Sequence, residues 1–122
     1  MRRNSLKGVG VVIAVLLAGC STVNDIRQNP PLLSIGSVKG AETVAECIQD
    51  GWQNTSLIGG TVGGQLQKLG SRYAVVAPNS ETPWHVADVS PNGAGSTVSY
   101  RFYRTWQSPP DRVTDVVKRC AR

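Results

Sequence analysis

The sequence predicts an α+β fold, a small two-layer domain in which a four-stranded antiparallel meander is flanked by an N-terminal and a C-terminal helix. Apolar residues recur at helical spacing in residues 41–53 and again in residues 109–121. Between these two segments, glycine and proline divide the chain into short runs. The expected order is therefore α-β-β-β-β-α, and connections this short favour antiparallel neighbours.

The two helices are predicted from their apolar stripes. In the first, one face collects Ala41, Val44, Ala45, Ile48 and Trp52. In the second, Ser108 is the expected N-cap, Pro109 suits the first helical position, and Asp111 lies in the first turn. The stripe that follows consists of Val113, Val116, Val117 and Cys120.

The strands are expected at residues 65–69, 72–77, 84–89 and 97–104. In the last of these, Val98, Tyr100 and Phe102 alternate with polar residues, which is the period of a sheet with one packed face. By the same alternation, we expect Trp84 and Val86 to be buried and His85 to face solvent.

The first twenty residues have the pattern of an exported chain. Three basic residues precede an apolar run over residues 9–16, which ends in Leu17-Ala18-Gly19-Cys20. The run is too short to span a hydrocarbon core about 30 Å thick. The last four residues resemble the lipobox of bacterial lipoproteins, and this resemblance implies cleavage between Gly19 and Cys20 and fatty acylation of Cys20. An ordinary secretory signal and an uncleaved anchor are the alternatives.

Three parts of the chain follow from this resemblance: a signal peptide at residues 1–19, a lipidated N-terminus with a flexible tether at residues 20–39, and one α+β domain at residues 40–122. Within the tether, Asn29-Pro30-Pro31 favours an extended conformation. We expect Leu32, Leu33 and Ile35 to dock back onto the domain as an edge segment.

The resemblance also implies a location in the cell envelope. In Gram-negative cells an aspartate after the lipidated cysteine tends to retain a lipoprotein in the inner membrane, so Ser21 favours the outer membrane, with the domain facing the periplasm. The membrane lipid would be reached through the acylated Cys20.

The net charge gives no indication of a nucleic-acid partner. The full chain carries 13 basic and 8 acidic residues, a formal charge of +5. Removal of residues 1–19 takes away three of the basic residues and leaves a charge of about +2. The remaining basic residues are dispersed, so nucleic acid is not an expected partner.

The cysteine count predicts a disulfide. With Cys20 lipidated, Cys47 and Cys120 remain, and in an oxidising compartment two such cysteines are expected to pair. The alternative is a reactive or metal-binding pair, for which His85 is the only histidine available. The spacing is far from a C-x-x-C motif, so we expect no metal and no other cofactor.

The arrangement resembles a group of small proteobacterial lipoproteins with little assigned function. The residues that carry this resemblance, besides the lipobox, are Ala45-Glu46-Cys47-Ile48 with Trp52, Val86-Ala87-Asp88-Val89, Gly93–Tyr100 and Val117-Lys118-Arg119-Cys120. These motifs are structural, and the resemblance implies no catalytic residues.

No constellation of residues predicts an enzyme. The nearest pair of carboxylates, Glu42 and Glu46, falls on what should be a solvated helix face. The glycines of residues 59–64 lack the Gly-Lys-Ser/Thr of a phosphate loop. We therefore expect a non-enzymatic protein.

The candidate partner-binding residues are Arg101, Tyr103 and Trp106, because tryptophan, tyrosine and arginine dominate protein contact sites. The expected function is a membrane-anchored module that binds an envelope protein, including a hydrolase to be inhibited. The alternatives are a structural or surface component without a dedicated partner and a carrier of a small ligand. The sequence does not indicate the oligomeric state.

Overall fold

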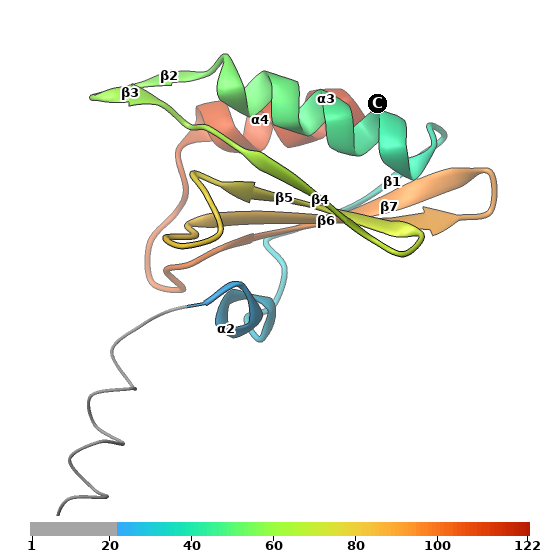
Figure 1. Ribbon diagram of the computed structural model, residues 1–122, viewed down its shortest axis with the longest axis horizontal. Helices are drawn as coiled ribbons and strands as arrows, with labels where there is room; N and C mark the ends of the chain where they lie inside the picture. Colours follow the sequence, from blue (N-terminus) through green and yellow to red (C-terminus); the bar gives the residue numbers. More distant parts are fainter. Residues whose placement is uncertain (1–21) are drawn as a thin grey trace, which may run out of the picture.

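The structure is a computed structural model that describes residues 22–122 (Figure 1). The predicted signal peptide, its cleavage site at Gly19 and the lipidation site Cys20 lie outside the described residues. The elements are α2 (Val23–Arg27), β1 (Leu33–Ser37), α3 (Ala41–Gln53), β2 (Ser56–Leu57), β3 (Gly60–Thr61), β4 (Gln65–Leu69), β5 (Arg72–Ala77), β6 (His85–Asn92), β7 (Gly95–Phe102) and α4 (Asp111–Ala121).

The predicted α+β class is confirmed, but the expected four-stranded sheet is wrong. The main sheet has five antiparallel strands in the order β1-β7-β6-β5-β4. The additional strand is β1, which pairs with β7 so that Leu33 faces Tyr100 and Ile35 faces Val98. Leu33 and Ile35 alternate with Ser34 and Gly36, and this two-residue period lets them pack on the core as an edge strand.

Residues that we expected in a flexible tether thus belong to the folded unit. Besides β1, helix α2 begins directly after Thr22, whose side chain accepts a hydrogen bond from the backbone N–H of Asp25. The Asp25 carboxylate accepts from the backbone N–H of Thr22 in return, at 2.9 Å. This capping box satisfies two backbone donors that a helix of five residues would otherwise leave free.

Helices α3 and α4 lie side by side over one face of the sheet, whereas α2 lies against the opposite face (Figure 1). The predicted C-terminal helix begins two residues later than expected. Its N-cap is Pro110 rather than Ser108, and no side chain caps it. The two prolines, Pro109 and Pro110, hold the chain extended before the helix can start.

The main core lies between α3, α4 and the sheet. Trp52 is its largest member, has no exposed surface, and donates a hydrogen bond from its indole N–H to the carbonyl of Val113 at 3.0 Å. This bond ties the end of α3 to the start of α4 while satisfying the one polar group of the indole. Trp52 also lies edge-on to Tyr100, with ring centroids 6.1 Å apart.

The predicted disulfide between Cys47 and Cys120 is confirmed, and it joins α3 to α4. The helices also approach closely at Gly51, where an added Cβ would lie 2.5 Å from a methyl group of Val116. The glycine that weakens α3 as an isolated helix is therefore the residue that allows α4 to pack against it.

Removal of the disulfide should destabilise the domain strongly. Cys47 and Cys120 are 73 residues apart, and the chain-entropy estimate for a loop of this length is about 4 kcal/mol. The double variant Cys47→Ala, Cys120→Ala should lose much of that free energy of unfolding, measured by urea denaturation. Reduction of the native protein should lower the urea midpoint in the same way, and an unchanged midpoint in both experiments would contradict the prediction.

Candidate functional site

The register of β6 against β7 reverses the predicted roles of Trp84 and His85. His85 pairs with Phe102 and is only 3% exposed, whereas Trp84 is 47% exposed. Residues opposite each other in an antiparallel pair share a face, so His85 belongs to the face that packs under α3 and α4. The expectation of a solvent-facing His85 and a buried Trp84 is therefore wrong.

His85 is held as a neutral ring inside the core. Its ring lies among those of Trp52, Tyr100 and Phe102, with centroids 5.8, 6.0 and 5.1 Å away. Burial lowers the pKa of His85 to about 4 and raises that of Tyr100. The Nδ1 atom of His85 lies 2.8 Å from the Tyr100 hydroxyl oxygen, so in a ring protonated on Nε2 this nitrogen accepts a hydrogen bond from the phenolic O–H. This hydrogen bond satisfies the Nδ1 atom of His85 and the hydroxyl of Tyr100, both of which lie in the core.

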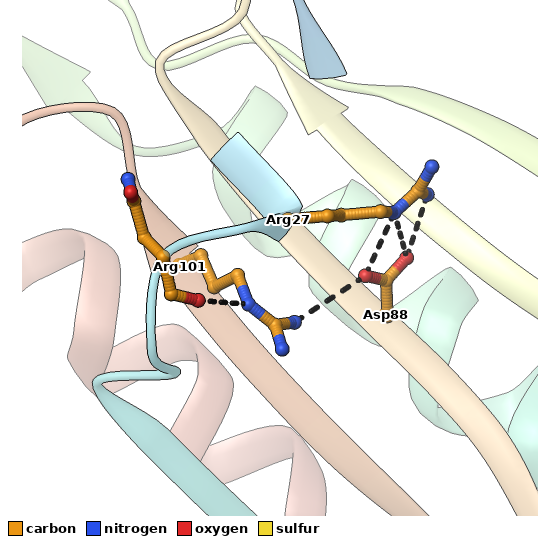
Figure 2. A network of polar contacts seen from close by, with 4 residues as sticks. Arg27, Asp88 and Arg101 are labelled. Carbon is orange, nitrogen blue, oxygen red and sulfur yellow. Dashed lines mark hydrogen bonds and ion pairs between the residues drawn. The ribbon is translucent and has the colours of Figure 1, made fainter. Parts of the chain in front are cut away.

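The opposite face of the sheet, which we call the α2 face, is fastened to α2 by a network of charges (Figure 2). The guanidinium of Arg27 donates three hydrogen bonds to the carboxylate of Asp88, at 2.7 to 3.2 Å. Such a bidentate pair fixes geometry as well as charge. Its hydrogen bonds raise the pKa of Arg27 against the lowering effect of its partial burial. Next to Arg27 in the sequence, Ile26 is buried.

Arg101, predicted as a partner-binding residue, belongs to this network instead. Its Nε–H donates to the carbonyl of Asn29 at 2.8 Å, and a terminal nitrogen lies 3.6 Å from Asp88 (Figure 2). The side chain thus joins the segment that follows α2 to β6. We call Arg27, Asp88 and Arg101, together with the Asn29 carbonyl, the clamp.

The other two predicted binding residues, Tyr103 and Trp106, lie in one cluster with Trp84 and Arg104. The ring of Tyr103 stacks on that of Trp84, with centroids 5.9 Å apart and planes at 21°. The guanidinium carbon of Arg104 lies 4.8 Å from the centroid of Tyr103 and 5.2 Å from that of Trp106. We call these four residues the aromatic cluster.

The aromatic cluster is both exposed and ordered. Trp106 is 76% exposed, and Trp84 is nearly half exposed. Stacked aromatic pairs contribute about 0.5–1.5 kcal/mol beyond burial, and exposed cation–π contacts about 0.5–1 kcal/mol. These contacts hold the rings in place before any ligand arrives, and such preorganisation lowers the entropy lost on binding.

A groove adjoins the aromatic cluster. Its volume is about 210 Å³, and it is lined by Asn29, Pro30, Pro31, Leu32, Phe102, Arg104 and Thr105. The groove therefore joins the segment after α2 to the segment after β7. Half-exposed Leu32 and the prolines make its wall mainly apolar, with one guanidinium at the edge.

Among residues 22–122, no three histidine, cysteine or acidic side chains gather where they could hold a metal ion. No helix in this range is both long enough and apolar enough to cross a bilayer.

Protonation of His85 should reduce stability in mild acid. The ordinary histidine pKa of 6.5 applies to the unfolded chain and the value of about 4 to the native one, so the unfolded chain binds more protons between these limits. The free energy of unfolding should then fall by about 3 kcal/mol as the pH falls from about 6.5 to about 4. Urea denaturation over this range measures the effect.

The matched variant is His85→Gln, which does not titrate and still offers an oxygen to the Tyr100 hydroxyl. It should lose this part of the pH dependence, although its stability at neutral pH will differ from that of the native protein. Equal pH dependence in both proteins would contradict the buried neutral histidine.

Comparison of the chain with protein-family models, with curated proteins and with solved structures gives no match.

Proposed function

We propose that the protein is a lipid-anchored lipoprotein of the cell envelope, whose domain is a non-enzymatic module that binds a protein partner through the aromatic cluster. The observation that carries this proposal is the exposure of two tryptophans in one ordered group with a tyrosine and an arginine. Residues of these types dominate the energetics of protein contacts.

The context of the aromatic cluster supports a binding role. Single apolar side chains on a surface need no explanation, but a group of neighbouring exposed rings is typical of an interaction site. Among the described residues, Arg104 donates its side-chain hydrogen bond to Gln107 and has no carboxylate partner. The guanidinium is therefore available to an acidic or carbonyl group of a partner.

The envelope location is proposed from the lipobox-like Leu17-Ala18-Gly19-Cys20 and is supported by the disulfide. A disulfide between α3 and α4 is expected to persist in an oxidising compartment and to be reduced in most cytosols. Ser21 favours the outer membrane, with the domain in the periplasm.

The anchor is tested by Cys20→Ala in the full chain, expressed in a Gram-negative host. The native protein should fractionate with membranes and carry a diacylglycerol and an N-linked acyl chain on Cys20, as measured by intact mass. The variant should lack both lipid additions and leave the membrane fraction. Unmodified native protein, or a variant that still pellets with membranes in high salt, would contradict the anchor.

The aromatic cluster is tested by photo-crosslinking in intact envelopes, with the reactive group at Thr105 beside it. The native protein should give a discrete adduct, and Trp84→Ala or Trp106→Ala should each weaken binding by about 30-fold or more, which is the loss typical of a hot-spot side chain. The matched control is Ile58→Ala, which removes a fully exposed apolar side chain from the turn between β2 and β3. Equal adducts in all four proteins, or none in the native one, would contradict the proposed contact.

A further inference from the structure

We infer that the α2 face of the sheet rests on the lipid surface that holds the protein, with the aromatic cluster in the headgroup layer. This inference depends on the proposed lipidation of Cys20 but not on the proposed protein partner. Three observations carry it: the length of chain between the anchor and α2, the attachment of α2 to the sheet, and the position of the aromatic cluster.

The connection between Cys20 and the first helix is short. Helix α2 is capped by Thr22, so only Ser21 separates the lipidated residue from the capping box. An extended chain advances at most about 3.6 Å per residue, so Thr22 lies within about 7 Å of the Cα of Cys20. That distance is about the thickness of one headgroup layer, roughly 5–8 Å, so the connection is too short to lift α2 far from the lipid surface.

Helix α2 cannot swing away from the sheet without loss of specific contacts. Arg27 is held by three hydrogen bonds to Asp88, and the neighbouring Ile26 is buried. The segment that follows is held through the bond from Arg101 to Asn29 (Figure 2). The clamp thus makes α2 a rigid connection between the anchor and the domain, and the face that carries α2 is turned toward the membrane.

The aromatic cluster lies at the end of the sheet where β6 begins and β7 ends. In the register of β6 and β7, Val86 faces Arg101, and both belong to the α2 face together with Asp88. Trp84 comes two residues before Val86, and Tyr103 comes two residues after Arg101. A backbone hydrogen bond of 2.9 Å from the Tyr103 N–H to the Trp84 carbonyl continues the pairing of the two strands. The ring of Tyr103 also lies 5.0 Å from that of Phe102, so the chain leaves the strict alternation here. The stacked pair therefore lies at the end of β6 and β7, beside the groove that residues 29–32 line.

The groove brings the two parts of this surface together. Residues 29–32, which follow α2, line it with Arg104 and Thr105. A five-residue helix is only about 7.5 Å long, so the groove is close to the anchored end of the chain. Leu32, Trp84 and Trp106 are therefore exposed on the side to which Cys20 is tied.

The chemistry of this surface suits a lipid headgroup layer. Tryptophan and tyrosine concentrate at membrane–water interfaces because each ring is apolar and carries a polar group. Arginine binds lipid phosphates through its planar fork. Trp84, Tyr103 and Trp106 supply the rings, and Arg104 supplies the cation.

This orientation identifies the kind of partner that the module can bind. A protein that reaches the aromatic cluster must approach in the plane of the membrane and displace headgroups, so it must reside in or on the same membrane. A partner that diffuses freely in the periplasm would meet the side that carries α3 and α4 instead.

The experiment uses lipidated protein, purified from envelopes and reconstituted in phosphatidylethanolamine–phosphatidylglycerol vesicles, with and without bromine on the acyl chains. Bromine quenches tryptophan fluorescence only at short range. We expect a loss of emission in the brominated vesicles, smaller in Trp84→Phe and Trp106→Phe than in the native protein. Trp52 is shielded in the core and should contribute no quenching, which makes it an internal control.

A second variant tests the rigid connection. Twelve glycine and serine residues inserted between Ser21 and Thr22 leave the domain unchanged and release it from the lipid surface, so the quenching should disappear. Lipidated native protein that is not quenched would overturn the inference while leaving the proposed function intact. Equal quenching with the long insertion would also overturn it, because the short connection would then not set the orientation. Protein without lipid by intact mass would overturn the anchor itself.

Discussion

The two-residue turn between β6 and β7 fixes which side chains of both strands share a face. Asn92 pairs with Gly95, and Gly93 in the turn adopts a φ of +60°, a conformation that side-chain-bearing residues rarely adopt. The register that starts at this turn places His85 opposite Phe102, and the side chain of His85 therefore points into the core. The same register places Asp88 on the other face, within reach of Arg27. A slip of one residue would exchange the two faces and abolish both the core and the clamp.

The two faces of the sheet are buried by different means. The face under α3 and α4 is closed by apolar side chains around Trp52, with the neutral His85–Tyr100 pair as its polar inclusion. The α2 face is covered by a short helix, where apolar residues including Ile26, Val76 and Val86 are buried and the Arg27–Asp88 pair adds a charged contact. Arg27 and Asp88 keep part of their side chains exposed, so neither loses all of its hydration. A charge pair of this kind fixes the position of α2 more than it adds to stability.

Much of this fold could be predicted from the sequence, because α3 and α4 have apolar stripes and turn residues delimit the four expected strands, which are found as β4–β7. The cysteines lie on the predicted apolar faces, and their pairing is confirmed. The docking of Leu33 and Ile35 as an edge segment was expected, but their pairing with β7 was not, because the two preceding prolines favour an extended chain without indicating a sheet partner. The face of His85 could have been predicted from the turn at Asn92–Gly93 combined with the packed face of Tyr100. The clamp could not, because nothing local in the sequence links Arg27 to Asp88, 61 residues away.

The disulfide and the aromatic cluster lie in different parts of the domain, the disulfide between α3 and α4 and the cluster at the end of β6 and β7. A small domain is marginal when its core alone stabilises it. The disulfide between α3 and α4 adds stability because it constrains the unfolded chain, and it needs no contribution from the exposed aromatic residues. The domain can then leave Trp84 and Trp106 in contact with solvent, although burial of either ring would add stability. Exposed rings that cost stability and are nevertheless ordered by stacking are best explained by a surface that the folded protein uses.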